Sequence, residues 1–166
     1  DIDVFLSSEE AKENLLTELK EVVVANGFDG INVDFEYMND AQRLVADDFI
    51  YFLQQLKIAG LGKISVDVMA NSVIKGDPEK LLKLMQSIDN LIIMAYDFHR
   101  PGSDYAGSVA PINSVAGERN ISEISQKIIE SNLPKEKVIM AYPLYGYMWQ
   151  TTSTEMESET IGTGWM

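Results

Sequence analysis

The sequence predicts an α/β protein in which parallel strands alternate with crossover helices. Helical periodicity and short apolar strand patterns follow one another along the whole chain, and this order favours a parallel sheet. The 166 residues are 46% hydrophobic and 23% charged, which is an ordinary globular composition. The pattern fits either an open doubly wound sheet or part of a (β/α)8 barrel, and we expect residues 1–166 to form a single domain.

The elements follow in order from local signals. A helix is predicted over residues 8–26, because Ser7 or Ser8 can cap its start and Gly27 can end it. Pro78 suits the first turn of a later helix. The other elements are predicted as a strand at 30–35, a helix at 40–59, a strand at 63–69, a helix at 77–88, a strand at 91–96, a helix at 121–131 and a strand at 137–142.

Three segments are predicted to lack regular structure. Residues 1–5 are expected to end a loop, and residues 99–117, which contain Gly and Pro, form a loop long enough to bind a ligand. Residues 145–166 are rich in Thr, Ser, Glu and Gly, and we expect an irregular tail there.

Composition argues against several classes of function. Thirteen basic residues against 26 acidic ones give a net charge of −13, which disfavours nucleic acid as a partner. No apolar run approaches a membrane span, so membrane insertion is not expected. The absence of cysteine excludes disulfides and thiolate metal sites. We therefore expect neither a metal nor another cofactor, whereas a neutral sugar meets no electrostatic conflict.

The predicted strand from residue 30 carries a polar ladder on one face. Ile31 and Val33 face one way, and Asn32, Asp34 and Glu36 face the other. Glu36 falls at the carboxyl end of the strand, where parallel α/β folds place their active sites. Because a neighbouring carboxylate raises a pKa, Asp34 could keep Glu36 protonated and able to donate a proton to a departing sugar.

This segment resembles the glycoside hydrolase family 18 signature DGxDxDxE. Asp29, Gly30, Asp34 and Glu36 match it, with Asn32 where the family usually has Asp. Residues 94–97 (Met-Ala-Tyr-Asp) and 142–146 (Tyr-Pro-Leu-Tyr-Gly) resemble two later family segments, in the same order. The resemblance implies a (β/α)8 barrel, of which this chain holds about half, roughly strands four to seven.

The resemblance also implies an activity, namely retaining hydrolysis of β-1,4-linked N-acetylglucosamine polymers through an oxazolinium ion formed by the substrate's own acetamido group. Glu36 would be the general acid. Asp34 would orient the acetamido group, and Tyr96 would hydrogen-bond its oxygen. The substrate-binding residues would then be Asp29, Asn32, Met94, Asp97 and Tyr145.

Other residues are interpreted from their positions in the sequence. Asp67 shares the inward face of its strand, where it can support Asp34 or pair with a lysine. Trp149 is added to the substrate-binding set because an indole can stack on a sugar face, as could Tyr105 or Trp165, although packing is the usual role of such residues. His99, the one histidine, is expected to shape the groove and not to bind a metal.

Two departures from the family pattern leave alternatives open. Tyr147 stands where many chitinases have Arg. The resulting Tyr-Gly-Tyr segment is similar to that of bacterial spore-cortex and cell-wall glucosaminidases of the same family. Chitin and peptidoglycan therefore both remain candidate substrates. The length is short for a barrel, which suggests a fragment or a half-barrel that self-associates through open sheet edges. A non-catalytic sugar-binding module and an inactive fragment are the competing functions. A secreted, cell-wall or spore location is expected, although no signal peptide is visible.

Overall fold

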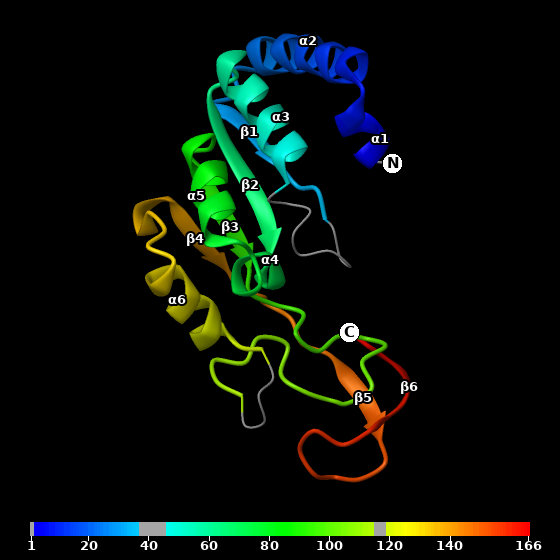
Figure 1. Ribbon diagram of the computed structural model, residues 1–166. Helices are drawn as coiled ribbons and strands as arrows, with labels where there is room; N and C mark the ends of the chain where they lie inside the picture. Colours follow the sequence, from blue (N-terminus) through cyan, green and yellow to red (C-terminus); the bar gives the residue numbers. More distant parts are fainter. Residues whose placement is uncertain (1, 37–45, 115–118) are drawn as a thin grey trace.

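The computed structural model describes residues 2–36, 46–114 and 119–166 (Figure 1). The helices are α1 (Ile2–Ser7), α2 (Glu9–Asn26), α3 (Asp47–Ile58), α4 (Ala70–Ile74), α5 (Pro78–Gln86), α6 (Ile121–Glu130) and the short 3-10 helix η2 (Lys135–Lys137). The strands are β1 (Gly30–Val33), β2 (Lys63–Met69), β3 (Asn90–Met94), β4 (Val138–Ala141), β5 (Met148–Thr151) and β6 (Thr160–Trp165). No helix in the described ranges is both long and apolar enough to cross a membrane.

The first four strands form one parallel sheet in the order β1-β2-β3-β4. Each strand pairs with the next one along the chain, and helices lie in the connections between them, as Figure 1 shows. The predicted α/β class and parallel sheet are therefore confirmed. The strand predicted at 63–69 has the observed bounds, and the other three strands overlap their predicted positions.

The two faces of this sheet differ in burial. Val33, Val66 and Ile93 are among the buried residues of one face, and they form a single core with buried residues of α3, α5 and α6. On the other face, Asn32 and Asp67 are only partly covered or exposed. This division matches the predicted alternation in β1 and leaves the polar face available for chemistry.

An aromatic cluster joins the start of the chain to the sheet. The Phe5 ring lies edge-on to Phe35 and Phe52, with centroids 6.1 and 5.3 Å away, and the Phe35 ring stacks on Phe52 at 5.9 Å. The prediction of a loop for residues 1–5 is wrong, because residues 2–5 begin helix α1. Packing of the partly buried Phe5 ring against residues far along the chain, together with burial of Leu6, holds so short a helix in place.

The helix ends follow the predicted capping. Ser8 Oγ accepts a hydrogen bond from the Ala11 amide at 3.2 Å, and Gly27 ends α2 in the left-handed conformation with φ 65°. Asp77 caps α5, which begins at Pro78. The helix predicted at 40–59 is α3, which begins at residue 47; residues 40–45 lie outside the described residues.

Gly30 allows β1 and β2 to meet at their amino ends. A Cβ atom at this position would lie 2.0 Å from the Lys63 carbonyl oxygen, so any larger residue would push the two strands apart. Lys63 also donates its backbone N–H to the Asp29 carbonyl at 2.9 Å. The glycine is therefore a packing requirement at the end of the sheet away from Glu36.

The tail of the chain is an antiparallel hairpin. Strands β5 and β6 pair with a register shift between Met148 and Gln150, so the predicted irregular tail over residues 145–166 is wrong for these two strands. Gly162 and Gly164 have positive φ, which hid the strand pattern of β6. The hairpin also hydrogen-bonds the loop after β3, where Thr160 donates its backbone N–H to the Asp104 carbonyl at 2.8 Å.

We expect Phe52→Ala to lower the free energy of unfolding by about 3 to 5 kcal/mol, because it removes a ring buried at the centre of the aromatic cluster. Urea denaturation followed by circular dichroism measures this change. Ile58→Ala on the same helix is the control, since Ile58 is 86% exposed and should cost little. Equal losses in the two variants would contradict the placement of the cluster.

Candidate active site

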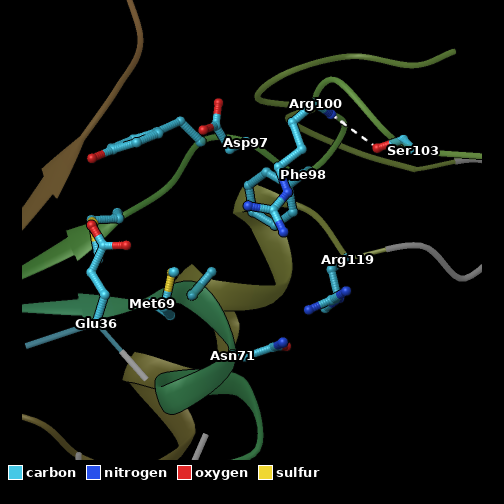
Figure 2. Close-up of a pocket in the computed structure, with 11 residues that line it drawn as sticks. Glu36, Met69, Asn71, Asp97, Phe98, Arg100, Ser103 and Arg119 are labelled. Carbon is cyan, nitrogen blue, oxygen red and sulfur yellow. Dashed lines mark hydrogen bonds between the residues drawn. The ribbon is translucent and has the colours of Figure 1, made fainter. Parts of the chain in front are cut away.

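A cavity of about 280 Å³ opens at the carboxyl ends of the first three strands (Figure 2). Strand β1 leads into Glu36, β2 into Asn71 through Met69, and β3 from Met94 into Asp97. The residues that line the cavity are Glu36, Met69, Ala70, Asn71, Met94, Tyr96, Asp97, Phe98, Arg100, Ser103 and Arg119. The position agrees with the general rule that parallel α/β sheets carry their sites at this edge.

The polar ladder of β1 is hydrogen-bonded to β2. Asn32 Nδ2 donates to Asp67 Oδ2 at 2.7 Å, and Ser65 Oγ donates to Asn32 Oδ1 at 2.5 Å. Both bonds follow from the register that sets Asn32 beside Ser65. Asn32 is therefore held by both of its amide atoms on the face that leads to the cavity, and Asp67 pairs with this amide.

The surroundings of Asp34, one of the acidic residues of the polar ladder, favour the protonated form of its carboxyl group. Burial raises the pKa of Asp34 above its ordinary value, and the negative charge of Asp67 raises it further. The sequence predicted a charge coupling between Asp34 and Glu36. The structure shows such a coupling between Asp34 and Asp67, across two neighbouring strands.

Asp97 follows β3 and has the left-handed backbone conformation with φ 57°, which is uncommon for residues other than glycine. Its Oδ1 accepts hydrogen bonds from the Tyr145 hydroxyl at 2.7 Å and from the Tyr147 hydroxyl at 3.0 Å. These bonds tie the end of β3 to the segment after β4. Burial raises the pKa of Tyr145 and Tyr147, and the bonds to Asp97 raise it further, so both phenols stay protonated as donors.

Tyr96 is a third phenol held in its protonated form, and it lines the cavity itself. Burial raises its pKa, and the negative charges of Asp67 and Glu36 add to the effect. A phenol that keeps its proton can donate a hydrogen bond to a substrate oxygen. The acidic surroundings of Tyr96 also attract positive charge that develops in the cavity.

A row of aromatic rings runs from Tyr96 to the hairpin. Centroids of successive rings are 6.4 Å apart for Tyr96 and Tyr145, 5.5 Å for Tyr145 and Tyr147, and 5.9 Å for Tyr147 and Trp149. Trp149 packs on Gly164, where a Cβ atom would lie 2.4 Å from the indole. These four rings form a continuous aromatic wall that begins at Tyr96 in the cavity and continues to Trp149 on β5.

The structure brings most of the predicted site residues together. Four of them line the cavity, namely Glu36, Met94, Tyr96 and Asp97. Asn32, Asp34 and Asp67 form the coupled group on the same face of the sheet, Tyr145 is bonded to Asp97, and Trp149 ends the aromatic row. Asp29 is not brought to the site, because it precedes β1 at the opposite end of the strand.

Several cavity residues were missed by the sequence predictions. Asn71 follows β2, and the rule that sites lie beyond strand ends could have indicated it. Arg100 and Arg119 stand at the two ends of a long connection between β3 and α6, and only the folded chain brings them to one cavity. No sequence pattern links these two arginines.

His99 and Tyr105 support the loop after β3. His99 Nδ1 lies 3.0 Å from the Ser108 carbonyl oxygen, and its ring packs so closely on Gly107 that a Cβ atom there would lie 2.5 Å away. Tyr105 bridges to Glu159 of the hairpin. Among the residues that the structure describes, no group of three or more acidic or histidine side chains could hold a metal ion.

Comparisons with known proteins give the family. The model of glycosyl hydrolases family 18 matches residues 2–164, and the chain belongs to this family. YvbX of Bacillus subtilis, an uncharacterized glycosylase, is 32% identical over 161 residues, covering 92% of this chain and 44% of that protein. YdhD of the same organism, whose name describes it as a sporulation-specific glycosylase, is 31% identical over 153 residues, covering 87% and 33%.

A solved structure shows the extent of the fold. A family 18 N-acetylglucosaminidase from Paenibacillus barengoltzii superposes with a TM-score of 0.81 at 17% identity, covering 99% of this chain and 54% of that one. The chain thus has the fold of about half of a (β/α)8 barrel, as predicted. It spans less than half the length of the two Bacillus relatives.

We expect Asp67→Asn to lower the pKa of Asp34 part of the way to its ordinary value, because the repulsive charge is removed while the burial remains. At a given mildly acidic pH, a smaller fraction of Asp34 is then protonated than in the unaltered protein. Carbon-13 NMR titration of the side-chain carboxyl measures this.

The matched control is Glu136→Gln, which removes one exposed negative charge next to the amino end of β4, at the opposite edge of the sheet. The Asp34 titration should not change in this variant. An equal shift in both variants would show that net charge, and not contact with Asp67, sets the pKa.

Proposed function

We propose that this chain carries the acid/base machinery of a retaining glycoside hydrolase that cleaves β-1,4-linked N-acetylglucosamine polymers. The observation that carries the proposal is the position of Glu36, which lines the cavity together with Tyr96 and Asp97 at the carboxyl edge of the sheet. Asp34, on the same face of the chain, supplies a second carboxyl group whose proton affinity is raised. Family 18 membership supports this reading of the geometry.

Glu36 acts first as an acid and then as a base. In the first step, its proton passes to the glycosidic oxygen as the bond from that oxygen to the anomeric carbon breaks, and the acetamido oxygen of the substrate bonds to the same carbon. In the second step, Glu36 takes a proton from water as the water oxygen bonds to the anomeric carbon. The oxazolinium ring opens, and the sugar keeps its original configuration.

The remaining groups position and stabilise the acetamido group. Asp34 accepts a hydrogen bond from the acetamido N–H, and Tyr96 donates one to its oxygen. Asp67 raises the pKa of Asp34, and the carboxylate of Asp67 also accepts the hydrogen bond that holds Asn32 in place. Asp97 binds the same sugar, and Tyr145 holds Asp97 in place.

The substrate and location are proposed from the relatives. One relative in Bacillus subtilis is described as a sporulation-specific glycosylase, and another is Chitinase 1 of Aphanocladium album, 29% identical over 147 residues. We infer action on an extracellular aminosugar polymer, in a secreted, cell-wall or spore setting. Residues 1–166 form a partial catalytic domain in this proposal.

Glu36→Gln is expected to abolish release of a fluorescent aglycone from an N-acetylglucosamine oligomer, with a loss of at least about 100-fold, because the glutamine amide has no acidic proton to transfer. The control Glu136→Gln should keep full activity, since that carboxylate lies at the far edge of the sheet. Hydrolysis that survives Glu36→Gln would contradict the mechanism. Sugar binding without hydrolysis in the unaltered chain would favour a binding module.

Self-association through the open sheet is a second part of the proposal. Strands β1 and β4 are the edges of the parallel sheet, and Ile139 on β4 is 46% exposed. Unpaired edges and exposed apolar residues favour pairing with a second copy.

Sedimentation velocity should show a concentration-dependent dimer that Ile139→Lys weakens by about tenfold or more, because a charged edge resists pairing. Ile129→Lys on α6, at an exposed position away from the sheet, is the control and should leave the dimer intact. A monomer at all concentrations would contradict the proposal.

A further inference from the structure

The cavity concentrates the arginines of an acidic chain. The sequence has net charge −13 and holds three arginines and ten lysines. Two of the arginines, Arg100 and Arg119, line the cavity, whereas no lysine does. A guanidinium group offers a planar fork that binds carboxylate with two parallel hydrogen bonds, and a lysine ammonium lacks this geometry.

The two guanidinium groups lie across the cavity from Glu36. Figure 2 shows Glu36 on one side and the side chains of Arg100 and Arg119 on the other, with Asn71 below them. Arg100 belongs to a turn held by hydrogen bonds to Ser103, which accepts the Arg100 amide on Oγ at 3.0 Å and donates its own amide to the Arg100 carbonyl at 3.0 Å. The backbone that carries Arg100 is therefore anchored.

Neither guanidinium takes part in an ion pair within residues 2–36, 46–114 and 119–166. Salt bridges in these ranges, such as those of Lys12 with Glu9 and of Lys83 with Asp47, do not involve Arg100 or Arg119. The cavity acid Asp97 is bonded instead to two tyrosines. Asn71, which also lines the cavity, has a buried Oδ1 atom without a hydrogen-bond partner in the same described residues.

We propose that Arg100 and Arg119 bind a carboxylate carried by the substrate, and that the cavity therefore prefers an acidic aminosugar polymer to a neutral one. The lactyl ether of N-acetylmuramic acid, which alternates with N-acetylglucosamine in peptidoglycan, supplies such a group wherever it carries no stem peptide, and chitin has none. This inference rests on the proposed function for the choice of sugar, and it names the substrate class of the same cavity.

The experiment measures binding in the Glu36→Gln background, so that no ligand is consumed. Isothermal titration compares an N-acetylglucosamine tetramer, an alternating tetramer with N-acetylmuramic acid, and the methyl ester of the latter. A fourth ligand carries a stem peptide on the lactyl group, so that its carboxylates lie on the peptide. We expect the free lactyl acid to bind about tenfold or more tightly than its ester.

Substitution of the arginines identifies the groups responsible. Arg100→Gln and Arg119→Gln should each reduce the ratio of acid to ester affinity about tenfold. Arg→Lys at the same positions should reduce this ratio less, because lysine keeps the positive charge but lacks the planar guanidinium group. Lys20→Gln removes one exposed positive charge on α2 and should leave the ratio unchanged. Circular dichroism confirms folding of each variant.

Several outcomes would overturn the inference. The inference is wrong if acid and ester bind with equal affinity, if the arginine variants weaken all ligands equally, or if no ligand binds. It is also wrong if the peptide-bearing ligand binds most tightly, because the recognised carboxylate would then belong to the peptide and not to the sugar. The proposed function fails separately, when hydrolysis persists in Glu36→Gln. The acid-to-ester ratio can be read whichever result the hydrolysis assay gives.

Discussion

The register of the parallel sheet is the constraint on which the site depends. Because Asn32 lies beside Ser65 and its amide reaches the Asp67 carboxylate, the polar residues of β1 and β2 share one face of the sheet. A shift of one residue would turn the ladder into the helix-covered core and expose Val33 or Val66 in its place. The buried apolar face therefore fixes the register, and the register fixes where the acids meet.

The turn at Asp97 joins the two halves of the site. Asp97 follows β3 with positive φ, and hydrogen bonds from Tyr145 and Tyr147 hold its carboxylate in place. Tyr147 supplies a neutral donor to Asp97, and the cationic groups of the cavity come from the loop between β3 and α6.

Local patterns were sufficient to predict the sheet and much of the site. Strict alternation of Ile64, Val66 and Val68 specified β2, and the coincidence of Glu36 with a strand end indicated the active edge. Helix α1 could not be predicted in this way, because a helix of six residues depends on the packing of Phe5 against Phe52. Such contacts between distant residues leave no local signal.

The same limit explains the residues that were missed or misplaced. Arg100 and Arg119 meet at one cavity only after the loop between them has folded, and neither is part of a spaced motif. Asp29 matched the family segment, yet it lies at the amino end of β1, where its carbonyl bonds β2. The glycines of β6 gave that segment the composition of an irregular tail although it pairs with β5.

The sequential strand order has a consequence for how the chain folds. Since β1, β2 and β3 each pair with the strand that follows them along the chain, each new strand of the parallel sheet can dock on a surface that already exists when it leaves the ribosome. The β5-β6 hairpin closes only a local loop and needs no distant strand. Folding in chain order would therefore bring Glu36 and its polar neighbours together before the aromatic wall forms.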